Sequence, residues 1–460
     1  MPSPRARSEG IGRLVQDASR LGERVEALRE AGDTLRLRAA EAGSNTENVS
    51  RIVSGASGLS RANADAIAEM ASGARQINAS IAGLSRLAAD NAAAVADLET
   101  AIGRFKTLDT SSLKSSDGRS LVAWTRAVKR VPPAHPRPES LPDTDERKWR
   151  SYEYAGWDVE KLPQPESPAD GPRGKRVACV LAGDHPCMSS YRRGMEKLAA
   201  AFGLEVRFSH SGFDPSLEKV RVAEAMSWKP DLLILLPASA KGGEALAASI
   251  HQARMPLLYS NTMRDQSCFR CRLAWTGPDD WAQSRVNARA FAEGLGVKGG
   301  YALAQHVPGT SPFYARSYAV VTELAKAAPN LHLLEAGHGG FDRKRTSDLV
   351  GTWLAKHGEA LRGIYSADDA DTALGIADAL ERTGRGDIVV SAAGASAIGL
   401  DLVGKGILHP ITYQSAEGDG ALALKAAVDW FSGLELEPLV YLPYEVITRE
   451  NLSSFLPAQW

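Results

Sequence analysis

Residues 230–236 read PDLLILL, five consecutive apolar residues directly after a Pro-Asp pair. A short apolar run behind a turn signal is typical of a strand that is buried on both faces. Similar runs recur on both sides of it, and amphipathic helical stretches separate them. The runs cover residues 176–181, 204–208 and 256–259, and the helical stretches cover 189–202, 217–228 and 238–254. Strands that alternate with helices in this way form parallel sheets covered on both faces.

The alternation continues through a second half of similar length. Strands are expected at 301–305, 331–335, 363–366 and 388–391, and helices at 281–295, 313–327, 344–356, 372–382 and 397–404. We therefore predict an α/β domain at 173–460, with two doubly wound parallel-sheet lobes joined by hinge strands. Lobe 1 is expected at about 173–278 and 415–441, and lobe 2 at about 279–413 and 442–460. Ligands of such folds bind in the crevice at the carboxyl ends of the strands.

Residues 1–110 have a different composition, with one aromatic residue, Phe105, and no proline after Pro4. Steps of three and four residues from Ile67 to Phe105 meet apolar or alanine positions, with Asn91 as the polar exception. A repeat of 3.5 residues sustained over this length predicts a long α-helical coiled coil. We expect residues 1–110 to self-associate, most simply as a dimer.

Residues 111–172 hold nine prolines between Pro132 and Pro172, mixed with charged residues. This composition predicts a Pro-rich linker that is partly extended. Its aromatic residues, Trp149, Tyr152 and Trp157 among them, allow for one patch docked on a neighbouring domain.

The overall composition excludes several classes of protein. A formal net charge of −1 gives no general attraction to nucleic acid or to anionic membranes. No apolar run approaches the ~18–20 residues of a membrane span, and no apolar stretch follows Met1 as in a signal peptide. We expect a cytoplasmic protein, with a periplasmic location as the alternative. We expect no cofactor and no metal. Two ordinary thiols are favoured for Cys268 and Cys271, with a local disulfide or a metal or redox role left open.

Several motifs, in a shared order, carry a resemblance. They are residues 180–186 (VLAGDHP), 191–194 (YRRG), 230–235, 255–261 (MPLLYSN), 277–280 (GPDD), 309–311 (GTS), 369–375 (DADTALG) and 406–414. In this order they resemble the type I periplasmic binding proteins, in the ribose-binding-like branch shared with the sensor domains of LacI-type repressors. The resemblance covers essentially all of residues 174–450.

The resemblance implies a set of ligand-binding residues and no catalytic ones. These residues are His185, Cys187, Met188, Asn261, Asp280, Tyr314, Arg316, Asp369 and Gln414. Tyr314 stands where the family often has an arginine, and Ala393 where an aspartate often holds sugar hydroxyls, so an ordinary aldose is disfavoured. The alternative for each residue is a structural polar group near a strand end.

The stretch 64–105 is similar to the trailing helix in the cytoplasmic coiled coil of methyl-accepting chemotaxis receptors. It has no counterpart of their hairpin tip and no Glu/Gln pairs at methylation positions. Together the segments predict a sensor and not an enzyme: a small, sugar-like solute closes the cleft, and the coiled coil signals to chemotaxis partners. A solute receptor for the permease of an ABC-type sugar importer is the alternative. A LacI-type regulator is less favoured, because residues 1–110 hold no helix-turn-helix.

Overall fold

The computed structural model describes residues 34, 36, 38, 81, 110–123, 138–157 and 159–460. The predicted coiled coil therefore lies outside the described residues, apart from four isolated positions. Residues 109–460 fall in one compact unit.

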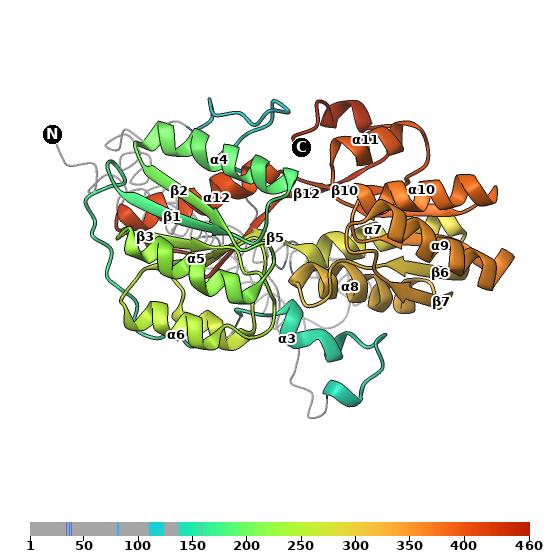
Figure 1. Cartoon of the computed structure of the whole chain (residues 1–460), viewed down its shortest axis with the longest axis horizontal. Helices are drawn as coiled ribbons and strands as arrows, with labels where there is room; N and C mark the ends of the chain where they lie inside the picture. Colours follow the sequence, from blue (N-terminus) through green and yellow to red (C-terminus); the bar gives the residue numbers. More distant parts are fainter. Residues whose placement is uncertain are drawn as a thin grey trace, which may run out of the picture. The chain divides into compact units, whose positions relative to one another are not determined.

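The unit is built on two six-stranded sheets (Figure 1). The first sheet has the order β11-β5-β4-β3-β1-β2, and all its pairs are parallel. The second has the order β12-β10-β9-β8-β6-β7, and only its edge strand β12 is antiparallel to its neighbour. The predicted α/β fold with two parallel-sheet lobes is confirmed.

The strands of lobe 1 are β1 (Arg176–Leu181), β2 (Glu205–His210), β3 (Leu232–Leu235), β4 (Leu257–Ser260), β5 (Ala274–Pro278) and β11 (Leu439–Leu442). Those of lobe 2 are β6 (Lys298–Ala304), β7 (Asn330–Gly337), β8 (Leu361–Ser366), β9 (Val389–Ala393), β10 (Ile411–Gln414) and β12 (Tyr444–Ile447). The helices of lobe 1 are α4 (Pro186–Phe202), α5 (Pro215–Ser227), α6 (Glu244–Gln252) and α12 (Ala416–Phe431). Those of lobe 2 are α7 (Asp280–Leu295), α8 (Ser311–Ala327), α9 (Arg343–His357), α10 (Asp371–Thr383) and α11 (Ala397–Gly404).

The side chains of β1 explain why helices cover both faces of its sheet. Val177 and Cys179 join the apolar cluster formed with α4 and α12, whereas Ala178 and Val180 join the cluster formed with α5 and α6. Successive residues of a strand point to opposite faces, so an all-apolar strand needs a cover on each. Figure 1 shows α4 and α5 on opposite sides of this sheet.

Helix α12 was not among the predicted helices, yet it completes the core of lobe 1. It packs along α4 at a distance set by two glycines. A Cβ on Gly194 would lie 1.8 Å from the main-chain oxygen of Glu417, and one on Gly420 would lie 1.9 Å from that of Tyr191. Only glycine allows two helices to approach this closely.

The chain passes between the sheets at three places, from β5 to α7, from β10 to α12 and from β11 to β12. These crossings form the hinge, and they lie near the predicted positions Pro278, Gln414 and Leu442. Each lobe is consequently made of two separate stretches of chain.

The described parts of residues 111–172 pack against both lobes. Trp149 stacks on Tyr318 of α8 with ring centroids 3.6 Å apart, and Tyr152 stacks on Tyr314 at 4.0 Å. Farther along, the indole N–H of Trp157 donates to the hydroxyl of Tyr441 on β11 (3.2 Å). The expected aromatic patch is therefore present, and this segment contacts lobe 2 and then lobe 1.

All four cysteines are free thiols, and Cys268 and Cys271 are buried in a short 3-10 helix, η3 (Gln266–Cys271). Across the part of the chain that the structure describes, no helix has both the length and the hydropathy of a membrane span.

Candidate ligand-binding cleft

A cavity lies between the two lobes where the carboxyl ends of their strands face each other. It holds about 820 Å³ of space, part of which opens to solvent. Residues of both lobes line it. They are Ala182, His185, Cys187, Met188, Phe213, Asn261, Thr262, His306, Pro312, Arg316, Phe341, Asp368, Asp369, Ala393, Gly394, Ala395, Gln414 and Trp460. The position agrees with the rule that ligands of doubly wound folds bind at the strand ends.

The structure brings seven of the nine predicted site residues to this cavity. His185, Cys187, Met188 and Asn261 come from lobe 1, Arg316 and Asp369 come from lobe 2, and Gln414 ends the crossing strand β10.

Tyr314 was predicted to line the cleft, but it lies elsewhere. Residues two apart on an α-helix point about 200° apart, so Tyr314 and Arg316 cannot face the same cavity. Arg316 takes the cleft side of α8, and Tyr314 stacks on Tyr152 of the docked segment.

Asp280 does not line this cavity either, and it supports the cleft from behind. Its Oδ1 accepts from Nε of Arg316 (3.0 Å) and from Nε2 of Gln283 (2.9 Å). Burial opposes the charge of Arg316, but the Asp280 carboxylate, together with Asp368 and Tyr365, raises the pKa of Arg316 overall. Arg316 also donates through NH1 to the main-chain oxygen of Ala367 (3.0 Å), which fixes the plane of its guanidinium.

The loop after β1 supplies His185, which caps the N-terminus of α4. Its Nδ1 accepts from the backbone N–H of Cys187 (3.2 Å), so a neutral ring carries its proton on Nε2. Burial raises the pKa of the Cys187 thiol to about 12, so Cys187 is a neutral, apolar-type wall and not a nucleophile.

Asn261 follows β4 and adopts a left-handed backbone conformation (φ 60°), which asparagine tolerates better than most residues. Its Nδ2 donates to Oδ2 of Asp419 on α12 (2.6 Å). This bond leaves Oδ1 of Asn261 as an acceptor for a ligand. Burial raises the pKa of Asp419 to about 8, against the lowering effect of this bond. Asp419 was not predicted as a site residue, because it lies on the helix that was not predicted.

Asp369 forms part of the floor beneath the cleft. Its side chain is fully buried, and its Oδ2 accepts from the N–H of Ser396 (2.8 Å). Its Oδ1 has no hydrogen-bond partner in the described part of the chain. A Cβ at Gly399 would lie 1.8 Å from Oδ2, so this glycine makes room for the carboxyl group. Burial, followed by the neighbouring Asp368, raises the pKa of Asp369 to about 7.

Gln414 is oriented by Gln283, whose Nε2 donates to Oε1 of Gln414 (2.7 Å). The amide nitrogen of Gln414 thus remains as a donor at the cleft. Gln283 also donates to Asp280, which in turn accepts from Arg316. The Gln283 side chain therefore connects Gln414 to the Asp280–Arg316 pair.

Four aromatic or imidazole rings in the cleft were missed. Phe213, His306 and Phe341 lie in loops after β2, β6 and β7, and Trp460 follows the last helical turn, so no motif pointed to them. His306 meets Phe341 edge-on at 4.7 Å, and His185 meets Trp460 edge-on at 5.4 Å. Burial, with Arg316 nearby, lowers the pKa of His306 to about 3, so this ring is neutral.

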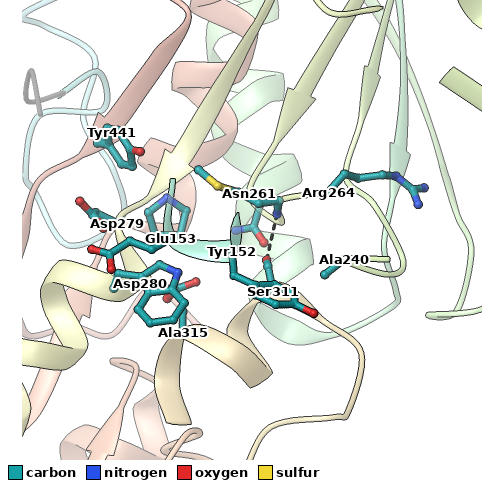
Figure 2. Close-up of a pocket in the computed structure, with 13 residues that line it drawn as sticks. Tyr152, Glu153, Ala240, Asn261, Arg264, Asp279, Asp280, Ser311, Ala315 and Tyr441 are labelled. Carbon is teal, nitrogen blue, oxygen red and sulfur yellow. Dashed lines mark hydrogen bonds between the residues drawn. The ribbon is translucent and has the colours of Figure 1, made fainter. Parts of the chain in front are cut away.

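A second, smaller pocket shares Asn261 with the cleft (Figure 2). It holds about 440 Å³ of space, against about 820 Å³ in the cleft. Figure 2 shows Tyr152 and Glu153 of the docked segment beside Asp279 and Asp280 of the hinge. Glu153 pairs with Arg285 at an O–N distance of 2.6 Å, and Asp280 pairs with Arg316. The larger cavity is therefore the candidate ligand site.

Comparisons with known proteins agree with the fold. A putative rhizopine-binding protein of Rhizobium meliloti is 21% identical over 275 residues, which are 57% of this chain and 86% of that protein. A solved ABC transporter solute-binding protein of Bacillus halodurans with bound myo-inositol superposes with a TM-score of 0.58 at 22% identity. The superposed region covers 63% of this chain and 99% of that protein. The fructose-binding periplasmic domain of a hybrid two-component system has a TM-score of 0.56 at 19% identity, covering 61% and 92%.

These similar proteins are binding proteins and not enzymes, which confirms the prediction of a domain without catalysis. The family model described as periplasmic binding protein domain matches residues 178–435, more than half of the chain. The chain therefore belongs to the periplasmic binding protein family.

Proposed function

We propose that residues 173–460 bind a small polyhydroxylated solute, a sugar or a cyclitol, by closing the two lobes around it. The observation that carries the proposal is the set of polar groups left available at the cleft. In each of three side chains, one polar atom is hydrogen-bonded within the protein and the other stays available to a ligand. The available atoms are Nε2 of His185, Oδ1 of Asn261 and the amide nitrogen of Gln414. Fixed donors and acceptors beside aromatic rings suit a solute with many hydroxyls and apolar ring faces.

The mechanism follows from the hinge. His185 and Asn261 belong to lobe 1, and Arg316 belongs to lobe 2. A solute contacts both sets of groups only when the lobes are closed, so it shifts the population by its higher affinity for the closed form.

The proposal predicts that Arg316→Ala weakens solute binding. Calorimetric titration of the full chain with myo-inositol, D-fructose and related polyols, after a thermal-shift screen, identifies a binding solute. Loss of a charge-assisted hydrogen bond costs ~1.5–3 kcal/mol, so we expect about a tenfold to hundredfold weaker affinity. Arg289→Ala is the matched control, because Arg289 pairs with Glu323 on the surface of the same lobe. A parent chain that binds no polyol, or an Arg316→Ala chain that binds as tightly as its parent, contradicts the proposal.

We further propose that binding is reported through residues 1–110, as in a sensor. The support is the heptad pattern of that segment and the docking of residues 110–123 on the ligand-binding domain. A sensor of this kind works in the cytoplasm. It self-associates through residues 1–110 and acts on a chemotaxis-type signalling partner.

An ABC-type sugar importer component is the second candidate, favoured by the names of similar solved proteins. A LacI-type regulator has less support. Fractionation separates the first two, because an importer's receptor is recovered from the periplasm and the sensor from the cytoplasm.

A further inference from the structure

Gln459 and Trp460 join the two lobes through consecutive main-chain oxygens. The oxygen of Gln459 accepts from the hydroxyl of Ser190 (2.7 Å) and from Arg193, both on α4 of lobe 1. The oxygen of Trp460 accepts from the N–H of Ala397 (2.6 Å), the first residue of α11 in lobe 2. Opening the hinge moves α4 away from α11, so the two attachments cannot both persist in an open form.

The side chain of Gln459 is buried, 6% exposed, at the crossing from β10 to α12. Its Oε1 accepts from the N–H of Glu417 (3.0 Å), and its Nε2 donates to Oγ of Ser415 (2.9 Å) and to the hydroxyl of Tyr413 (3.2 Å). The residue thus contacts the end of a lobe 2 strand and the start of a lobe 1 helix at once.

The ring of Trp460 lines the cleft and meets His185 of lobe 1 edge-on. The segment that leads to it belongs to lobe 2, because Phe455 in η5 (Leu452–Phe455) is buried in the lobe 2 core. A lobe 2 segment therefore supplies an aromatic wall opposite lobe 1. Trp460 also lies outside the 178–435 stretch that the family model matches.

Asp117 connects the same contacts to the segment 110–123. Its Oδ2 accepts from Nε2 of Gln459 (2.8 Å) and from the hydroxyl of Tyr413 (2.5 Å). The neighbouring Ser116 donates its N–H to Oε2 of Glu417 (3.1 Å). Arg119 lies over the ring of Phe455 at 4.2 Å. The segment that precedes the binding domain is thus docked on the hinge and on the Gln459 side chain.

We propose that Gln459 and Trp460 form a latch of the closed cleft. In this latch, the Trp460 ring contacts the bound solute and sets specificity. Gln459 is a positioning residue: it holds that ring and, through Asp117, couples closure to the docking of residues 110–123. This inference rests on the proposed solute binding. It follows from geometry, because an open form cannot keep both the attachment to α4 and the attachment to α11.

The role of Trp460 is tested by titrating full-length variants with myo-inositol and D-fructose. An apolar sugar face that stacks on an aromatic ring adds to the binding free energy. Without this contact, Trp460→Ala should bind the solute about tenfold more weakly. Trp460→Phe should restore most of the affinity. Leu456→Ala is the matched control, because Leu456 is an exposed apolar residue (53%) of the same segment. Unchanged affinity in Trp460→Ala overturns the solute contact while leaving solute binding by the cleft intact.

The coupling is tested by amide hydrogen exchange across residues 110–123 of the full chain, with and without myo-inositol. The N–H of Ser115, Gly118 and Leu121 are hydrogen-bonded within this segment. Solute should slow their exchange in the parent, and this slowing should disappear in Asp117→Ala and in Gln459→Ala. Ser120→Ala should keep it, because among the described residues the Ser120 hydroxyl bonds only to Val122 of the same segment.

Gln459→Glu provides a second variant if Gln459→Ala fails to fold, because it keeps the acceptor and replaces the donor to Asp117 with a like charge. Retained slowing in both Gln459 variants overturns the coupling. If myo-inositol does not bind the parent, solute binding fails for that compound. The solute-free comparison then decides the latch, with faster exchange of residues 110–123 expected in the Gln459 variants and equal exchange overturning it.

Discussion

At the scale of single residues, the cleft is notable for carboxyl groups that are buried without a full set of partners. Among the residues that the structure describes, Asp369 and Asp419 each keep one oxygen without a hydrogen-bond partner, and burial raises the pKa of both. A carboxyl that is protonated near neutral pH can donate as well as accept. The floor of this site therefore changes its hydrogen-bonding character between weakly acidic and weakly basic conditions.

Asp419 should make the protein less stable as the pH rises from about 4 to about 8. The pKa of Asp419 is about 8 in the folded chain, above its unfolded value, so the folded state holds the proton over this range. The contribution of the protonated Asp419 to the free energy of unfolding is fully present near pH 4 and is lost as the pH rises to about 8. Asp419→Asn should reduce this slope, seen as melting temperature against pH.

Part of the slope should remain in that variant, because Asp369 titrates near pH 7 in the folded chain. Asp401→Asn, at an exposed position on α11, serves as the control. An identical slope in the parent and in Asp419→Asn would show that Asp419 is ionised throughout.

The sequence located most of the cleft, because a motif places a residue at a strand end and parallel strand ends converge. His185, Asn261 and Asp369 were found in this way. Tyr314 does not line the cavity, because alignment to a motif ignores the 200° that separates this residue from Arg316 on the helix. His306, Phe341 and Trp460 could not be found, because they lie in loops and in the C-terminal stretch outside the recognised motifs, where no local pattern marks a residue as facing the cleft.

At the scale of elements, the contact between α4 and α12 depends on two residues without side chains. Gly194→Ala should destabilise lobe 1, because the added Cβ would meet the main-chain oxygen of Glu417. Overpacking of this kind costs about 1–3 kcal/mol. Chemical denaturation measures the change. Gly386→Ala should leave stability almost unchanged, since nothing lies within 4 Å of a Cβ there. Equal stability of the two variants would mean that the helices separate at little cost.

Eight of the twelve strands and most helices were predictable, because apolar runs and 3.6-residue periodicity are local signals. Strands β5, β10, β11 and β12 lie at the hinge and were expected only as hinge strands without bounds. Helix α12 was missed for a physical reason. Its first turns contain Gly418 and Gly420, which lower intrinsic helix propensity, and it is buried on nearly all sides, so it shows little amphipathic contrast. Tertiary packing against α4, which no local pattern reveals, determines this helix.

At the scale of the whole molecule, the docked segments should stabilise the domain that they cover. A chain of residues 173–460 retains both apolar cores but loses Leu121 and Trp149, which are buried in the longer chain. We expect it to fold, with a lower melting temperature than residues 110–460. Differential scanning calorimetry compares the two. A chain of 173–460 that is unfolded, or one that melts together with 110–460, would contradict this expectation.

Self-association should follow the N-terminal segment alone. An apolar heptad seam is not stable in water as a lone helix. Sedimentation should therefore show an oligomer for the full chain and a monomer for residues 110–460. A monomeric full chain at micromolar concentration would count against the coiled coil.

The interruption of lobe 1 by lobe 2 also has a consequence for synthesis on the ribosome. The α12 residues Leu424, Val428 and Phe431 belong to the same core as β1, yet they are translated after the whole first stretch of lobe 2. At ~5–20 residues per second, the nascent lobe 1 waits on the order of ten seconds with an uncovered apolar face. During that interval the growing chain offers a binding surface to chaperones that the finished protein no longer has.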